Sequence, residues 1–106
     1  MRRFAALRRR ADFGRLKRSG RRVSSQSVTI YTAPAAPGDP VSLVGITVSS
    51  SIGKAVVRNK LRRRIAAIVN ELLGPGRVRM LVVPRPPAAA LSFEELRAEL
   101  GALVPQ

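Results

Sequence analysis

The residues of this chain that could do chemistry are concentrated between positions 54 and 64, and the chemistry they suit is the binding of negative charge. The segment holds one amide and six cations: Lys54, Arg58, Asn59, Lys60, Arg62, Arg63 and Arg64. No acidic residue lies among them, and the next one along the chain is Glu71. Ammonium and guanidinium groups donate strong hydrogen bonds to phosphate oxygens, and guanidinium does so through two donors at once. The segment therefore predicts a surface that binds a polyanion.

The same segment has the period of an amphipathic helix, which would gather the cations on one surface. Apolar residues recur every three or four positions and predict a helix over residues 54–73: Val57, Leu61, Ile65, Ile68 and Leu72. At about 100° per residue, Arg58 and Arg62 flank this stripe on one side, while Lys60 and Arg64 flank it on the other. Like charges four residues apart destabilise a helix by roughly 0.2–0.5 kcal/mol per pair. We therefore expect a polyanion to offset this cost.

Composition favours the same function and excludes several others. The 106 residues carry a net charge of +14, which favours nucleic acid over an anionic membrane as the partner. Cys and His are absent, so zinc fingers, thiol nucleophiles and histidine bases are excluded. The six acids show no spacing that would make a metal site, and whether the protein holds a metal stays unknown. No apolar run resembles a membrane span or a signal peptide, so we expect a cytoplasmic protein.

The remaining elements predict one domain over residues 1–106, with residues 1–10 as a flexible basic arm. A first helix would begin near Asp12 and end at Gly20, and strands are expected at residues 22–24, 26–33, 41–48 and 78–83. A last helix would begin at a capping box that joins Ser92 and Glu95. The order is α-β-β-β-α-β-α, which indicates an α/β (α+β) sandwich.

Two of the predicted strands have faces of different character. Val28 and Ile30 would point to one side of their strand, and Tyr31 to the other. In the next strand, Gly45 and Thr47 share a face whose small side chains leave room for a close neighbour. This pattern indicates that one face of the sheet packs in the core while the other is free to receive a partner.

The segment from Gly53 to Arg63 resembles the signature of the bacterial ribonuclease P protein family. It reads Gly-Lys-Ala-Val-Val-Arg-Asn-Lys-Leu-Arg-Arg, where the family has Gly-x-Ala-Val-x-Arg-Asn-Arg-x-Lys-Arg. Weaker matches flank it, among them Asp12-Phe13 in the first helix and Val48-Ser49 before the motif. The resemblance implies a four-stranded mixed sheet with a left-handed β-α-β crossover, the ribosomal protein S5 domain 2-like fold.

The resemblance also implies a function that no single residue could reveal. Similar proteins are subunits of an endoribonuclease that removes the 5′ leader of precursor tRNA, and catalysis belongs to an RNA subunit with its Mg²⁺ ions. The residues that would then contact the catalytic RNA are Lys54, Arg58, Asn59, Lys60, Arg62, Arg63 and Arg64. A cleft beside the first helix would receive the leader, with these lining residues: Phe13, Lys17, Tyr31, Thr47 and Ser49. The chain departs from the family pattern at Lys17, at Ser50-Ser51 and at Ala66.

Three other functions remain open at this stage. A structural RNA-binding protein of the ribosomal type would need the same charge and could share the fold class. A DNA-binding module could place helix 54–73 in the major groove, although no helix-turn-helix spacing precedes it. An autonomous nuclease is disfavoured because the chain has no His and no evident pairing of acids. We expect neither a membrane nor DNA as the partner.

Overall fold

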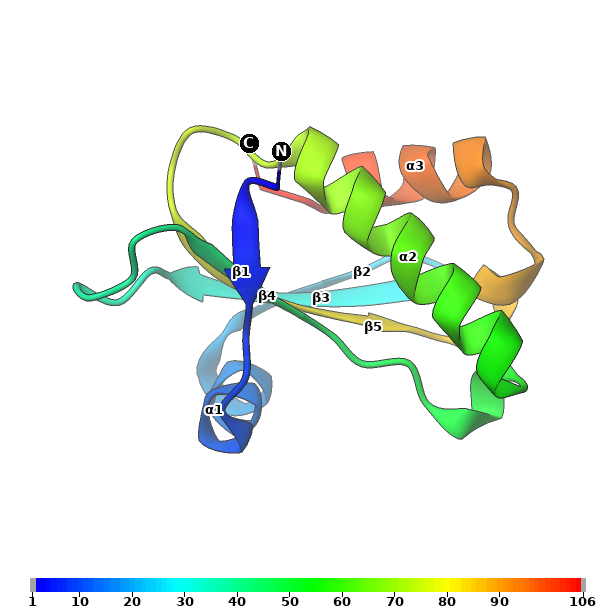
Figure 1. Ribbon diagram of the computed structural model, residues 1–106, viewed down its shortest axis with the longest axis horizontal. Coiled ribbons are helices and arrows are strands. Elements are labelled where there is room, and N and C mark those ends of the chain that lie inside the picture. Colours follow the sequence, from blue (N-terminus) through cyan, green and yellow to red (C-terminus); the bar gives the residue numbers. More distant parts are fainter. Residues whose placement is uncertain (1, 106) are drawn as a thin grey trace.

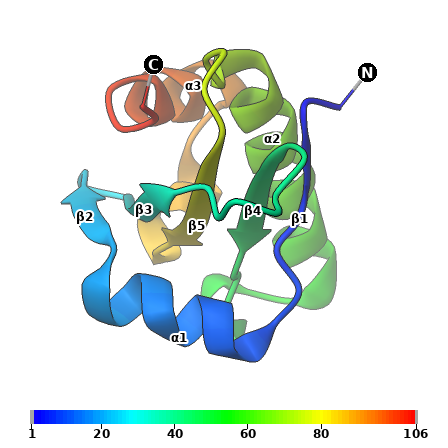
Figure 2. The ribbon, with the colours of Figure 1, turned by 90° about the vertical axis from the view of Figure 1, so that its left-hand side faces the viewer.

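A computed structural model describes residues 2–105 and shows a five-stranded sheet between two layers of helices (Figures 1 and 2). Helices α2 and α3 cover one face of the sheet, and α1 crosses the other. The order of the strands is β1-β4-β5-β3-β2, in which β1, β4 and β5 run parallel and β3 pairs antiparallel with both β5 and β2. The bounds are β1 Phe4–Ala6, α1 Arg10–Ser19, β2 Arg21–Ser24, β3 Val28–Pro34, β4 Ser42–Ile46, α2 Ala55–Leu72, β5 Val78–Pro84 and α3 Phe93–Gly101, with short 3₁₀ helices at Ser50–Ile52 and Pro86–Ala90.

Helix α2 makes the crossover between β4 and β5, which are parallel neighbours. In Figure 1 both strands run toward the right, β4 lies nearer the viewer than β5, and α2 passes above them. A chain that moves from β4 to β5 along this path turns left-handed, against the usual preference for right-handed crossovers. The unusual hand that the family resemblance implies is therefore confirmed.

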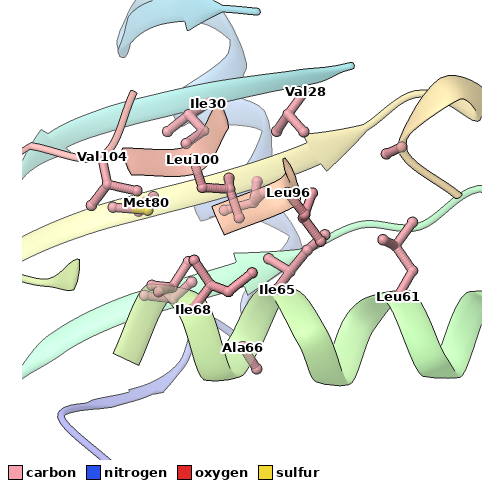
Figure 3. Close-up of a cluster of buried hydrophobic side chains, with 14 of the residues drawn as sticks. Val28, Ile30, Leu61, Ile65, Ala66, Ile68, Met80, Leu96, Leu100 and Val104 are labelled. Atoms are coloured by element: carbon pink, nitrogen blue, oxygen red, sulfur yellow. The ribbon is translucent and has the colours of Figure 1, made fainter. Parts of the chain in front are cut away.

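The main core lies between the sheet and helices α2 and α3 (Figure 3). Its most deeply buried side chains come from β3, β5 and the three-to-four-residue stripes of both helices: Val28, Ile30, Met80, Val82, Ile65, Ile68, Leu96 and Leu100. Each such side chain contributes about 1.5–3 kcal/mol to folding by leaving water. The predicted stripe of α2 is confirmed at Leu61, Ile65 and Ile68, and Leu72 is partly buried against the same cluster.

Val57 continues the predicted apolar stripe but lies outside the core, because the residue is 39% exposed. The first turn of α2 packs beside the two 3₁₀ helices instead of over the strands, so the stripe has little to cover it there.

The capping box at the start of α3 is confirmed: the Ser92 hydroxyl accepts from the Glu95 N–H at 3.1 Å, and the Glu95 carboxylate accepts from the Ser92 N–H at 2.8 Å.

A second, smaller core holds α1 against the opposite face of the sheet. Leu7, Leu16 and Leu81 are buried there, and Phe13 and Tyr31 pack around them in half-buried positions. Gly20 follows the last residue of α1 and donates its N–H to the Leu16 carbonyl, as expected of a helix that ends at this glycine.

An arginine on β5 ties α1 to the loop between β3 and β4. Arg79 donates from Nε and Nη2 to the two carboxylate oxygens of Asp39, at 2.8 and 3.0 Å, and from Nη1 to Asp12 at 3.1 Å. The hydrogen bonds from Arg79, assisted by the Ala36 N–H, lower the pKa of Asp39 from its ordinary value of 3.8 to about 2. This cluster fixes the start of α1 relative to the sheet.

The prediction of a flexible arm over residues 1–10 is wrong from Phe4 onward. Residues Phe4–Ala6 form β1, which pairs in parallel with β4, so the sheet has five strands instead of the expected four. Phe4 is 7% exposed and Leu7 is 5% exposed, so two apolar side chains anchor an otherwise basic segment. A three-residue strand is too short to show an alternating pattern, and its partner is about forty residues away in the sequence.

Candidate nucleic-acid interface

The outward surface of α2 carries the cations predicted from the sequence to bind a polyanion. Four residues of the helix are exposed: Asn59, Lys60, Arg62 and Arg63. Lys54, which lies at the N-terminal boundary of the helix, is exposed as well. Arg58 and Arg64 are half-buried, because each lies at one border of the surface. The structure thus brings all seven predicted RNA-binding residues together along one helix.

No carboxylate neutralises this surface within residues 2–105. The four ion pairs found there join Arg15 and Arg79 to Asp12, Arg79 to Asp39, and Arg97 to Glu71. The α2 residues instead make local contacts: Arg62 donates to the Asn59 side-chain oxygen at 2.9 Å, and Arg58 donates to the Gly53 carbonyl at 3.2 Å. These contacts hold two guanidinium groups in place without cancelling their charge, which suits a rigid phosphate-binding surface.

The helix dipole adds to the same positive potential. No side chain caps the N-terminus of α2, and its first turn contains no acid. The free N–H groups of a helix start carry partial positive charge and favour anions. Because Lys54 and Arg58 lie at this end, cations and helix dipole act in the same direction on any phosphate that approaches.

A second candidate surface lies on the face of the sheet that α1 crosses. Phe13 of α1 lies under Gly45 of β4, where the missing side chain admits its ring. Phe13 and Tyr31 both contact the Leu7–Leu16–Leu81 cluster, so the structure places the two predicted aromatic residues on one face. Each of the two residues is half-buried.

The polar residues predicted for this second surface are more widely spread. Lys17 is exposed on α1, whereas Thr47 and Ser49 are exposed in the connection that leads from β4 to α2. Among the described contacts, none joins these three residues to Phe13 or Tyr31. Their part in leader binding stays a prediction.

Two arginines that the sequence pattern did not indicate belong to these surfaces. Arg22 on β2 is the cross-strand partner of Tyr31 and is exposed on the same face. Arg2 lies over the Phe4 ring, with its guanidinium carbon 4.9 Å from the ring centroid. Basic residues fill the N-terminal segment, and only the register of β2 and the position of Arg2 over Phe4 distinguish these two.

Four of the acids are held by other groups of the protein. Asp12 and Asp39 are bound by Arg79, and Glu71 is bound by Arg97. Glu99 accepts from the Ser27 N–H, and hydrogen bonds led by the Ser25 hydroxyl lower its pKa. Across the part of the chain that the structure describes, no three potential ligands cluster to hold a metal ion.

Comparisons with known proteins match the whole chain to one family. The sequence profile of the family described as Ribonuclease P matches residues 1–106. The chain belongs to the ribonuclease P protein family. The ribonuclease P protein component of Acidothermus cellulolyticus is 41% identical over 100 residues, covering 92% of this chain and 83% of that protein. The protein component of Thermobifida fusca is 38% identical over 102 residues, covering 89% of this chain and 69% of that protein.

Solved structures of the family have the same fold. The ribonuclease P protein of Staphylococcus aureus superposes with a TM-score of 0.83 at 25% identity, over 92% of this chain and 90% of its own. The ribonuclease P protein of Thermotoga maritima superposes with a TM-score of 0.80 at 28% identity, over 93% of this chain and 94% of its own. These matches favour a ribonuclease P protein over a structural protein of the ribosomal type and over a DNA-binding module.

None of the helices between residues 2 and 105 has the length and apolar character needed to span a membrane.

Proposed function

We propose that this ribonuclease P protein binds the catalytic RNA of the enzyme through the outward surface of α2. The observation that carries the proposal is that this surface, Lys54 to Arg64, is positively charged and bound by no carboxylate of the described chain. Each phosphate that such a surface neutralises releases condensed counterions, which drives binding at moderate salt. A folded RNA also offers the closely spaced phosphates that a rigid row of cations requires.

The aromatic surface beside α1 is the proposed site of the precursor tRNA leader. A single-stranded leader exposes its bases, and exposed aromatic rings stack on bases without regard to sequence. Phe13 and Tyr31 supply two half-buried aromatic residues on one face, and Arg22 supplies a cation next to Tyr31. Lys17, Thr47 and Ser49 would line the borders of this path.

The chain would assist cleavage by positioning RNA and would leave the chemical step to its partner. In this proposal the catalytic RNA would hold the Mg²⁺ ions, and these ions would supply the chemistry of cleavage. The residues of the protein raise the affinity for RNA and screen its negative charge, so that less Mg²⁺ is needed for the RNA to fold and bind substrate. This work on precursor tRNA would take place in the cytoplasm.

Reconstitution with the cognate catalytic RNA tests this function. Precursor tRNA cleavage would be measured at low Mg²⁺ with protein and RNA together, with protein alone and with RNA alone. We expect cleavage at the 5′ end of the mature tRNA to be stimulated only in the mixture. Cleavage by the protein alone, or no stimulation by a folded protein, would refute the proposal.

A substrate comparison isolates the leader contact. Tyr31→Ala should weaken binding of precursor tRNA to the assembled enzyme and leave binding of mature tRNA, which has no leader, unchanged. Tyr31→Phe keeps the ring and serves as the matched control. An equal effect of Tyr31→Ala on both tRNAs would show that Tyr31 does not act on the leader.

A further inference from the structure

The edge of the sheet has a notch where β1 stops short of β4. The last pair of the two strands is Ala6 with Val44, after which the Leu7 N–H donates to the Val44 carbonyl at 3.0 Å. The chain then turns away toward α1, while β4 continues to Ile46 (Figure 2). A space of about 360 Å³ lies there, bordered by α1 and α2. Cavities of roughly 300–1,000 Å³ are the size that takes small ligands and single groups of larger ones.

The lining of the notch combines apolar walls with positive charge. Its apolar surface comes from Phe4, Phe13, Ile46 and Ala66. Three arginines also line it: Arg2, Arg62 and Arg63. No acid lines it. An apolar space next to several guanidinium groups suits a ligand with a flat, weakly polar body and a phosphate. A nucleotide has both parts.

The backbone of β4 offers a hydrogen-bonding edge inside the notch. The Val44 carbonyl accepts from Leu7, so the polar backbone groups of Val44 point toward β1. Thr47 donates its N–H to Val82 of β5, on the opposite side. Because orientation alternates along a strand, the N–H and C=O of Ile46 point toward β1, where no β1 residue lies opposite them. A donor and an acceptor side by side match the edge of a nucleobase.

The notch also adjoins the cationic surface already described. Arg62 and Arg63 belong to both, so an RNA that lies along α2 brings its phosphates to the mouth of the notch. Proteins that read folded RNA commonly do so at unstacked bases, which they hold by contacts to the base edge and face. Because the notch shares two arginines with the α2 surface, the same RNA is favoured over a peptide or a lipid as its occupant.

We infer that the notch receives one unpaired nucleotide of the catalytic RNA. Its base enters toward the Ile46 backbone, flanked by the Arg2 guanidinium, and its phosphate is bound by Arg62 and Arg63. This inference rests on the proposed function, since it names a contact within that RNA complex. It gives the protein a means of selecting its register on the RNA that phosphate contacts alone do not supply.

Two neighbouring alanines of β1 provide a matched test. Both are exposed, but successive side chains point to opposite faces of a strand, and Ala6 lines the notch. Ala6→Phe fills the notch without changing any charge, and Ala5→Phe adds the same ring on the other face. Affinity for the cognate catalytic RNA would be measured for the parent and both variants, together with chemical probing of the base edges of the RNA.

The parent and Ala5→Phe should bind alike and protect the base edge of one unpaired nucleotide. Ala6→Phe should lose that protection and bind about tenfold more weakly, the loss expected when one base contact is removed. Equal affinity and unchanged protections for Ala6→Phe would overturn the inference. A change in self-association instead of RNA binding would assign the notch to a second copy of the chain, and would overturn it as well.

A second variant keeps the test decisive if Ala6→Phe does not fold, which thermal unfolding would show. Arg2→Gln leaves the notch open and removes the guanidinium over Phe4, so it should weaken binding several-fold and reduce protection of the same nucleotide. Parent-like binding and protection by Arg2→Gln would then count against the inference. Absence of RNA binding by the parent protein would instead refute the proposed function, so the two failures are distinguishable.

Discussion

Phe13 lies so close beneath Gly45 that a β-carbon on residue 45 would stand 2.6 Å from the ring atom Cε1 and 2.9 Å from Cζ. The glycine is required by this approach and not by its backbone angles, since Gly53 is the residue with positive φ in the described chain. The contact ties α1 to β4 at the point where the aromatic surface and the notch meet. The position of the Phe13 ring therefore depends on the absence of a side chain in the neighbouring strand.

Gly45→Ala should destabilise the protein, even though alanine is the better strand residue in isolation. The added methyl group would force the Phe13 ring aside, and overpacking of this kind costs about 1–3 kcal/mol of unfolding free energy. Urea denaturation would measure the loss. Phe13→Leu should recover part of it when the two changes are combined, because the smaller side chain makes room. Strictly additive losses would show that the ring and residue 45 do not interact.

Stability in acid should depend on Asp39. Arg79 and the Ala36 N–H hold the pKa of the folded carboxyl at about 2, below its ordinary value of 3.8. The unfolded chain therefore binds a proton at higher pH than the folded chain, and stability present above pH 4 is lost as the pH falls toward 2. Asp39→Asn should show a shallower decline of unfolding free energy over this window. Parallel curves for the two proteins would contradict the role given to Asp39.

Truncation of two apolar residues of α2 should have unequal effects. Leu61 is 4% exposed in the main core, so Leu61→Ala should cost about 2–5 kcal/mol of unfolding free energy. Val57 is 39% exposed at the first turn, so Val57→Ala should lower the unfolding free energy by about 0.5 kcal/mol or less. Chemical denaturation of both variants checks this difference. Similar losses would mean that the first turn of α2 packs more tightly than the structure shows.

Most of the fold could be predicted from local patterns. The period of Leu61, Ile65 and Ile68 predicted α2, and the capping box at Ser92 predicted the start of α3, because both signals are contained within a few turns. What local patterns could not predict is β1, since Phe4 gains its burial in the main core and Leu7 gains its burial in the small core under α1. Val57 fits the helical period as well as Leu61 does, and only the tertiary packing distinguishes them.

The residues of the candidate site likewise differ in whether the sequence alone could indicate them. The cations of α2 are visible in the sequence because one helix carries them all. Arg22 became a candidate only through its register opposite Tyr31, and Arg2 only through its position over Phe4. The notch requires the end of one strand, the edge of another and two helices, so no spacing in the sequence could have indicated it.

The salt dependence of RNA binding tests the central claim most directly. The claim is that the uncompensated cations of α2 bind the phosphates of the catalytic RNA. Arg62→Ala with Arg63→Ala would be compared with a control that removes the same charge from arginines already paired with acids, Arg15→Ala with Arg97→Ala. The α2 variant should bind more weakly at every salt concentration, with a log–log salt slope about two units shallower than the parent's. A parent-like slope for the α2 variant, or an equal loss in the control, would contradict the account.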